Sequence, residues 1–380
     1  MEGAVGAVLE RRLRRGGARP VAVALSGGGD SLALLLAAAA WAKTAARPIH
    51  VLTVDHRLRP ESRGWTEACA ATAARLGLAF SALAWTGDKP LTGLPAAARE
   101  ARHRLLADAA RAAGARVILM GHTADDVLEA RLMREAGSST PEPREWSPSP
   151  AWPEGRGTFL LRPMLEVRRA EIRAWLSRRG QRWIDDPANE DPAFARPRAR
   201  QALSQGAAPP AQPPAASPKS LALACALMDD GGLELPRAAL AAADPRARLA
   251  FVSIACVCAA GARRPPRGEA VERLAARLAS EAPFTAGLAG ARVEGHGRMA
   301  RFRRERGEAA RGGLAPLWLT AGAPAVWDGR FEVDADRAVE VRARPGTALP
   351  MAVDEGRLTV RPLALERLLA ACGAVEREPG

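Results

Sequence analysis

The chain has 380 residues, of which 48% are hydrophobic, and it carries a formal net charge of +13. This composition excludes a largely disordered chain, and the longest apolar run, residues 31–42, is shorter than the ~20 residues that a membrane helix needs. Five scattered cysteines without a C-x-x-C pair exclude a zinc ribbon, an iron–sulfur site and a disulfide framework, so a cytoplasmic location is expected.

The positive charge comes almost entirely from arginine. The planar guanidinium group suits phosphates and base edges, and a basic excess of this size favours a polyanionic partner such as a nucleic acid. The alternative is a coding bias, because Ala, Arg, Gly and Pro abound and Tyr is absent.

Residues 1–20 predict a short amphipathic helix and not a signal peptide. Helical patterns then alternate with apolar, strand-like stretches at 20–27, 47–56, 79–85 and 115–122. This alternation predicts an α/β fold in which a parallel sheet has helices on both faces. Such sheets bind ligands at the carboxyl ends of their strands, where Ser26, Asp55 and His122 stand.

The chain is less regular after this α/β part. Residues 137–157 are polar and predict a flexible loop, and a helix follows at 167–180 with Gly180 as its stop. A turn-rich basic stretch leads to a low-complexity linker at 206–220, which closes an N-terminal domain of residues 1–205.

Two further regions are expected beyond the linker. Residues 221–310 predict a mainly helical domain, with helices over 221–283 and a basic hairpin over 290–306. Residues 311–380 form a short C-terminal region with weak strand signals.

A glycine-rich turn follows the first predicted strand and reads Ser-Gly-Gly-Gly-Asp-Ser. Backbone amides in such a turn, together with the start of a helix, can hold a phosphate. Neither the Walker form with its lysine nor the dinucleotide form G-x-G-x-x-G is present. The alternative is a tight turn before a capped helix. We assign nucleotide phosphate binding to Ser26, Gly27, Gly28, Gly29, Asp30 and Ser31.

The string S-G-G-x-D-S resembles the pyrophosphate loop of the N-type ATP pyrophosphatases, the PP-loop superfamily. The resemblance implies a Rossmann-like fold and an enzyme that cleaves ATP between its α and β phosphates. It also explains the missing lysine, because backbone amides and hydroxyls hold the pyrophosphate that leaves. In this family the end of the second strand contacts adenosine, which assigns Asp55 and His56 to ATP binding.

Four more stretches, at 54–62, 96–106, 121–135 and 160–200, are similar in order and spacing to PP-loop ligases that form lysidine in tRNA. The resemblance implies adenylation of O2 of the wobble cytidine, C34, in a tRNA(Ile) with a CAU anticodon. Free L-lysine then attacks C2 and AMP leaves. ATP and Mg²⁺ are the implied cofactors.

His122, Asp126 and Glu129 are spaced i, i+4 and i+7, so they share one face if the segment is helical. These side chains can hold Mg²⁺, bind the ammonium group of lysine or move a proton. We expect Asp126 and Glu129 to bind metal or lysine, His122 to lie near the cytidine, and Asp30 with Asp126 to hold Mg²⁺. The alternative is a solvated helix start favoured by the helix dipole.

Arginines supply the remaining candidate residues. Arg102, which has Arg99 one turn before it, is expected to bind the α-phosphate as a catalytic group, and Arg196 is expected to point toward the active site. The alternative for each is an exposed arginine. We assign contacts with tRNA phosphates to Arg198, Arg200, Arg301, Arg303 and Arg304.

Two other functions stay open at this point. One is another PP-loop tRNA-modifying enzyme such as a 2-thiocytidine synthase, which the missing C-x-x-C disfavours. The other is a nucleotide-binding module without catalysis, which the three acids Asp30, Asp126 and Glu129 disfavour. The oligomeric state is expected to be monomer or homodimer.

Overall fold

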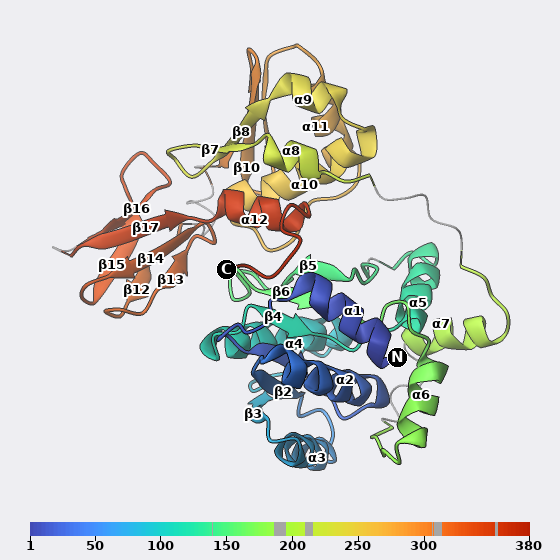
Figure 1. Ribbon diagram of the computed structural model, residues 1–380. Helices are drawn as coiled ribbons and strands as arrows, with labels where there is room; N and C mark the ends of the chain where they lie inside the picture. The colour runs from blue at the N-terminus through green and yellow to red at the C-terminus, as the bar shows by residue number, and fades with distance from the viewer. Residues whose placement is uncertain (139, 186–194, 210–215, 306, 308–313, 354–355) are drawn as a thin grey trace. The chain divides into compact units, whose positions relative to one another are not determined.

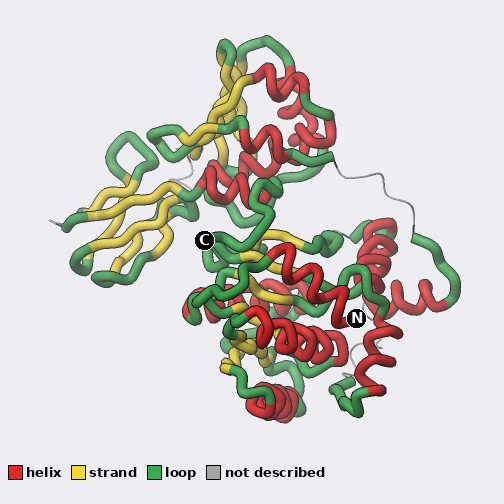
Figure 2. Tube along the Cα trace, in the orientation of Figure 1, coloured by secondary structure: helices red, strands yellow, loops and turns green. Residues whose placement is uncertain are grey.

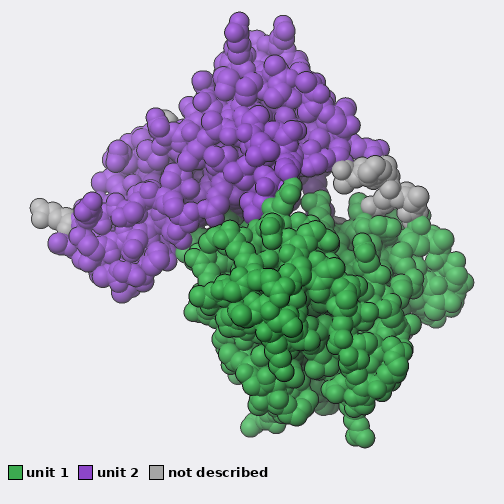
Figure 3. Space-filling model, viewed as in Figure 1, with its two compact units in different colours: residues 1–213, 376–380 green, residues 214–375 purple. Residues whose placement is uncertain are grey.

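The computed structural model describes the chain except residues 139, 186–194, 210–215, 306, 308–313 and 354–355. Two compact units are present (Figure 3). Residues 1–213 and 376–380 form the first unit, and residues 214–375 form the second. No helix of the described residues is long and apolar enough to cross a membrane.

The first unit contains a six-stranded sheet with the order β3-β2-β1-β4-β6-β5 (Figure 1). All neighbouring strands are parallel except β5, which runs antiparallel to β6. The order reverses direction at β1, so the carboxyl ends of β1 and β4 flank the crevice where ligands of such sheets bind. The strands are β1 (Val21–Ala24), β2 (Ile49–Asp55), β3 (Ala79–Ala84), β4 (Val117–Leu119), β5 (Trp146–Pro148) and β6 (Phe159–Leu161).

Helices cover both faces of this sheet, as the sequence predicts (Figures 1 and 2). Val21 and Val23 join a core with α1, α2, α3 and α6, whereas Ala22 joins a core with α4 on the opposite face. Alternate residues of a strand face opposite sides, so a strand that is apolar throughout needs cover on both. The helices are α1 (Glu2–Arg12), α2 (Gly29–Ala45), α3 (Ser62–Arg75), α4 (Leu94–Ala112), α5 (Ala124–Glu135), α6 (Arg169–Arg178) and α7 (Ala195–Ser204).

The flexible loop predicted for residues 137–157 is only partly correct, because the segment contains strand β5. Trp146 of β5 stacks on Phe159 of β6, with ring centroids 4.7 Å apart and planes inclined by 7°. Aromatic stacking across neighbouring strands stabilises the pairing beyond the burial of area. The polar composition of the segment concealed this single aromatic anchor.

The second unit combines helices with three antiparallel sheets. The helices predicted within 221–283 are present, and the predicted basic hairpin is formed by β10 and β11. A five-stranded sheet with the order β7-β8-β11-β10-β9 packs on these helices in one core. The helices are α8 (Lys219–Leu223), α9 (Arg237–Ala242), α10 (Pro245–Ala260), α11 (Glu269–Ala279) and α12 (Ala364–Ala371). The strands are β7 (Ala226–Leu227), β8 (Leu233–Pro236), β9 (Phe284–Leu288), β10 (Ala291–His296) and β11 (Met299–Arg304).

The weak strand signals near the C-terminus correspond to two three-stranded sheets with their own small core around Trp327 and Phe331. The mainly helical prediction for the second domain is therefore only partly correct, because β7 and β8 interrupt the helices of 221–283 and strands dominate the rest of the unit. The strands are β12 (Leu317–Leu319), β13 (Ala325–Trp327), β14 (Phe331–Ala335), β15 (Val339–Ala343), β16 (Pro350–Ala352) and β17 (Leu358–Pro362).

Candidate active site

The glycine-rich turn joins β1 to α2, which begins at Gly29. The Ser26 and Ser31 hydroxyl oxygens lie 3.1 Å apart, and Ser31 Oγ donates to the Gly28 carbonyl at 2.9 Å. Gly27 has a φ of +85°, a backbone conformation that favours glycine. The turn therefore presents two hydroxyl groups and the start of a 17-residue helix toward the same place.

Close packing leaves little room for a side chain at two glycines around this turn. A Cβ atom on Gly27 would lie 2.5 Å from Ile184 Cδ1, and Ile184 N donates to the Gly27 carbonyl at 3.0 Å. A Cβ atom on Gly121, after β4, would lie 3.1 Å from the backbone of Asp30 and Ser31. The loop is thus held in place from both sides.

A pocket of about 530 Å³ opens at the carboxyl ends of β1, β2 and β4. Its volume is within the range of small-molecule and cofactor sites. It is lined by residues of β1, β2, α2, α3, α4, α5, α6 and α7 and of the loop after β4, which are far apart in the sequence. The predicted site residues in its lining are Ser26, Gly28, Gly29, Asp30, Ser31, Asp55, His56, Arg102, His122, Asp126, Arg196 and Arg200.

Three carboxylates of the site converge on one guanidinium group that the sequence analysis missed. Arg169 lies at the start of α6, and its Nε is 3.2 Å from Asp30 Oδ2. Its Nη1 is 3.0 Å from Glu129 Oε1, and its Nη2 is 3.5 Å from Asp126 Oδ1. The structure thus brings together Asp30, Asp126 and Glu129. Arg169 stands inside the stretch 160–200, but an arginine pair at a helix start does not by itself indicate such a role.

Glu129 is fully buried and does not face the pocket directly. Besides Arg169, it accepts a hydrogen bond from Arg200 Nε at 2.9 Å, and Arg196 Nε lies 3.7 Å from its Oε2. Both arginines come from α7, so this carboxylate links α5, α6 and α7. A buried carboxylate needs such partners, because an unpaired buried charge is costly.

Asp126 has a second role at the start of α5. Its Oδ2 accepts hydrogen bonds from the Thr123 backbone N at 2.8 Å and from Thr123 Oγ1 at 2.9 Å. This capping box satisfies backbone donors at the helix start and fixes the carboxylate. The predicted helical spacing of His122, Asp126 and Glu129 is only partly correct, since His122 precedes the helix and lies in the loop after β4.

Arg99, Arg162 and Arg196 gather around Arg102, which forms no ion pair with an acid of the described residues. Burial, followed by the charges of Arg99, Arg196 and Arg162, lowers the pKa of Arg102 to about 10. The Arg102 Nε is shielded from solvent and has no hydrogen-bond partner in the described part of the chain. A concentration of uncompensated guanidinium groups is an anion receptor.

His122 faces this arginine cluster. Arg162 Nε donates a hydrogen bond to His122 Nδ1 at 3.2 Å, and both side chains are buried. Burial, followed by the charges of Arg162 and Arg102, lowers the pKa of His122 well below its ordinary value. His122 is therefore uncharged at neutral pH.

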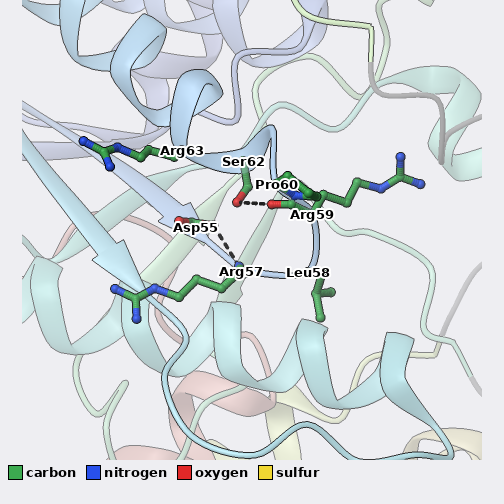
Figure 4. A pocket seen from close by; sticks show the side chains of 7 residues that line it. All are labelled: Asp55, Arg57, Leu58, Arg59, Pro60, Ser62 and Arg63. Carbon is green, nitrogen blue, oxygen red and sulfur yellow. Dashed lines mark hydrogen bonds between the residues drawn. The ribbon is translucent and has the colours of Figure 1, made fainter.

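The end of β2 and the loop after it form the rim of the pocket. Asp55 Oδ1 accepts from the Arg57 backbone N at 2.7 Å, and Ser62 Oγ donates to the Arg59 carbonyl at 2.8 Å. Figure 4 shows the arginine side chains of this loop extending in different directions around an open hollow of about 710 Å³. His56 packs edge-to-face on Trp85 at 6.1 Å, and burial lowers its pKa.

The residues assigned to tRNA have different surroundings. Arg198 is exposed on α7, whereas Arg200 is paired with Glu129. In the second unit, Arg301 and Arg303 of β11 pair with Glu234 at 3.2 Å and Asp230 at 3.1 Å. Arg304 pairs with Asp328 at 3.0 Å, and both of these side chains are more than nine-tenths buried.

Next to Arg102, His103 is buried, and neither of its ring nitrogens has a hydrogen-bond partner among the described residues. Burial lowers the pKa of His103 well below its ordinary value. A buried histidine of this kind stays neutral in the folded protein but gains a proton in the unfolded chain. The free energy of unfolding of the protein therefore decreases as the pH falls through the unfolded pKa of histidine, near 6.5.

Substituting His103→Leu should therefore raise the free energy of unfolding by ~1 kcal/mol at pH 7.5, because two unsatisfied ring nitrogens are removed. It should also flatten the loss of stability below pH 6.5, where each buried neutral histidine contributes up to about 1.4 kcal/mol per pH unit. Urea unfolding of both proteins at pH 7.5 and 5.5 measures this. If the free energy of unfolding fell by the same amount between pH 7.5 and pH 5.5 in both proteins, this prediction would be wrong.

A parallel sheet with a glycine-rich phosphate turn after β1, facing converged acids and arginines, defines a nucleotide-using α/β enzyme of the PP-loop class. Comparison with known proteins agrees with this class, because a PP-loop domain family matches residues 5–207.

Similarity to individual proteins extends over nearly the whole chain. The tRNA(Ile)-lysidine synthase of Caulobacter vibrioides is 48% identical over 373 residues, which are 98% of this chain and 86% of that protein. The enzyme of the same name from Hyphomonas neptunium is 37% identical and covers 77% of this chain and 82% of its own length. The enzyme of the same name from Brucella ovis is 38% identical, and the match covers 83% of this chain and 74% of that protein. The chain belongs to the tRNA(Ile)-lysidine synthase family, and it is a tRNA-modifying ligase that uses ATP.

Proposed function

We propose that the protein converts the wobble cytidine, C34, of a CAU-anticodon tRNA(Ile) into lysidine, using ATP, Mg²⁺ and free L-lysine. One observation carries this proposal. One pocket at the carboxyl edge of the sheet holds the phosphate loop, the carboxylates of Asp30 and Asp126, and Arg102, whose Nε has no hydrogen-bond partner among the described residues. Asp30 and Asp126 converge with the buried Glu129 on Arg169. Such a pocket has separate places for a polyphosphate and for a cationic amine.

In the first step, O2 of the cytidine attacks the α-phosphorus of ATP, and the bond to the β-phosphate breaks. Ser26, Ser31 and the amides between them hold the pyrophosphate that leaves. Arg102 binds the α-phosphate, where negative charge develops, and Arg196 supports it from α7. Asp55 and His56 lie at the end of β2, where they can contact the adenosine.

In the second step, the lysine amine attacks C2 of the adenylated cytidine, and AMP leaves with its oxygen. Asp126 and Glu129, whose carboxylates both contact the Arg169 guanidinium, would bind the ammonium group of lysine. The ammonium group must lose a proton before it attacks, and a carboxylate of this pair accepts it.

Asp30 and Asp126 would hold Mg²⁺. Their fit rests on the donor set, since two carboxylates face one cation, and Mg²⁺ is usually bound by one or two carboxylates plus substrate phosphates. Burial and the nearby Asp126 charge raise the pKa of Asp30, whereas the charge of Arg169 opposes this shift. The ion would neutralise charge on the ATP phosphates.

Arginines of both units would bind the tRNA backbone. Arg198 is exposed, and Arg301 and Arg303 keep more than a third of their side-chain surface accessible. Arg200 and Arg304 are engaged with Glu129 and Asp328, so they would contact tRNA only in addition to these pairs. Since tRNA and ATP are the substrates, the proposal includes a cytoplasmic location. It leaves monomer and homodimer open.

Incubating a CAU-anticodon tRNA(Ile) transcript with the protein, ATP, Mg²⁺ and isotopically labelled lysine tests the proposal by mass spectrometry. We expect labelled lysine on the wobble cytidine with the intact protein and none with Asp30→Ala. Release of AMP and pyrophosphate without lysine transfer would mean that the nucleophile or the RNA is wrong. No ATP-dependent change at all would favour a binding module.

A further inference from the structure

His122 and Arg162 stand at the carboxyl ends of two neighbouring parallel strands. β4 ends at Leu119 and β6 at Leu161, and these two residues are paired in register. The loop after each strand therefore begins at the same edge of the sheet. This pairing places the Arg162 Nε 3.2 Å from the His122 Nδ1, although 40 residues separate them in the chain.

A guanidinium group has only donors and stays protonated in proteins. The nitrogen that accepts its hydrogen bond must therefore carry no proton. For His122 this nitrogen is Nδ1, so the proton of the neutral ring is on Nε2. Protonating both nitrogens would break the bond and place a second charge beside Arg162.

We propose that Arg162 is a positioning residue that keeps His122 in the neutral form protonated at Nε2, so that His122 donates a hydrogen bond to the reacting nucleotide and does not act as a base. This inference rests on the proposed function. The donor it supplies would meet an oxygen that becomes negative, on the α-phosphate or at O2 of the cytidine.

Arg162 is itself held on its other side. Its Nη1 donates to the Arg144 carbonyl at 2.7 Å and to Ser147 Oγ at 3.1 Å, both from the segment that contains β5. Its backbone N donates to the Glu145 carbonyl at 2.8 Å. With these contacts the guanidinium group cannot turn away from His122 without losing buried hydrogen bonds.

The charged groups around His122 all oppose a positive ring. Arg99 and Arg102 approach from α4, Arg196 from α7 and Arg162 from the end of β6. His103 of α4 is a further neighbour and is neutral as well. The two acids nearest along the chain are both engaged by other groups: Asp125 accepts from Arg168 Nη2 and Arg169 N, and Asp126 Oδ2 accepts from Thr123 Oγ1.

His122 lines the nucleotide pocket, whereas Arg162 lies behind it. In the part of the chain that the structure describes, no group is hydrogen-bonded to His122 Nε2, and this atom is not enclosed by protein. The N–H group is therefore free for a ligand. Consequently the proton that lysine loses must go to a carboxylate and not to His122.

Nitrogen-15 NMR of the full-length, histidine-labelled protein tests the inference without depending on activity. Long-range proton–nitrogen correlations distinguish the two ring tautomers, and the spectrum of His122→Gln assigns the His122 signals. We expect Nε2 protonated and Nδ1 unprotonated from pH 8 to pH 6. Protonation at Nδ1, or a charged ring at pH 7, would overturn the proposal even if lysidine forms.

The variant Arg162→Met removes the donor. We expect its His122 signals to show exchange between the tautomers and its kcat for pyrophosphate release to fall about 10-fold or more, with little change in the KM for ATP. Arg178→Met, at an exposed position of α6, is the matched control and should keep both the spectrum and the rate. An unchanged His122 tautomer in Arg162→Met would overturn the positioning role.

Two amide substitutions distinguish the roles of the two nitrogen atoms of the His122 ring. A glutamine amide can replace the Nε2–H donor, whereas an asparagine amide occupies the place of Nδ1. His122→Gln should keep kcat within about 10-fold of the native protein, and His122→Asn should lose about 10²-fold or more, which is the usual size of such catalytic contributions. Equal losses in both variants would contradict the donor role.

Discussion

Substituting Arg102→Met lowers kcat/KM for tRNA-dependent pyrophosphate release by about 10²–10³-fold, the usual effect of removing one preorganised donor from a developing anion. This guanidinium group forms no ion pair with any acid of the described residues, and its Nε has no hydrogen-bond partner among them. Its pKa of about 10 still leaves it charged at neutral pH. We therefore expect this charge to bind an anionic group of the substrate.

Stability should change in the opposite direction. Arg99, Arg162 and Arg196 all repel Arg102, so methionine relieves repulsion at this position. We expect the melting temperature of Arg102→Met to equal or exceed that of the native protein while activity falls. Arg104→Met, at an exposed position on the same helix, is the matched control and should leave kcat/KM unchanged. Similar kinetic losses in both variants would argue against a phosphate-binding role for Arg102.

The phosphate loop could be predicted from sequence because it is local. The six residues Ser26–Ser31 lie between one strand and one helix, and the turn requires glycine at Gly27, where φ is +85°. Apolar strands alternating with helical patterns likewise specify a covered parallel sheet. Because the strands are parallel, Asp55 and His122 must lie at the same edge of the sheet as Ser26, the edge formed by the carboxyl ends of the strands.

Arg169 and Arg162 could not be predicted from local signals. Arg169 meets Asp30 across 139 residues, and its position depends on how α6 packs against α2 in the core. Arg162 meets His122 because β4 and β6 pair in one register out of several possible. In a chain so rich in arginine, composition cannot distinguish these two from exposed ones. In the second unit, β7 and β8 were missed and the C-terminal strands gave only weak signals for a related reason. Such short strands gain stability from partners distant in sequence, as β8 does from β11.

Substituting Glu129→Gln should reduce lysidine formation at subsaturating lysine by about 10²-fold. Removing one partner of a buried, hydrogen-bonded charge pair costs 2–5 kcal/mol, and about 2.7 kcal/mol corresponds to that factor. Glu129 is fully buried, and its Oε1 accepts from both Arg169 and Arg200. Glutamine keeps the shape and an acceptor oxygen, so the packing of α5, α6 and α7 is preserved while the negative charge is lost.

The two half-reactions distinguish this role from general damage to the site. Pyrophosphate release in the absence of lysine should stay within a few-fold of the native rate in Glu129→Gln, because the phosphate loop and Arg102 are unchanged. The KM for lysine should rise, since the ammonium group then has one carboxylate fewer. Glu135→Gln, exposed at the end of the same helix, should match the native protein in both assays. If Glu129→Gln kept the native KM for lysine and the native turnover, the amine would have to bind at other groups, and the buried carboxylate would serve only to join the three helices.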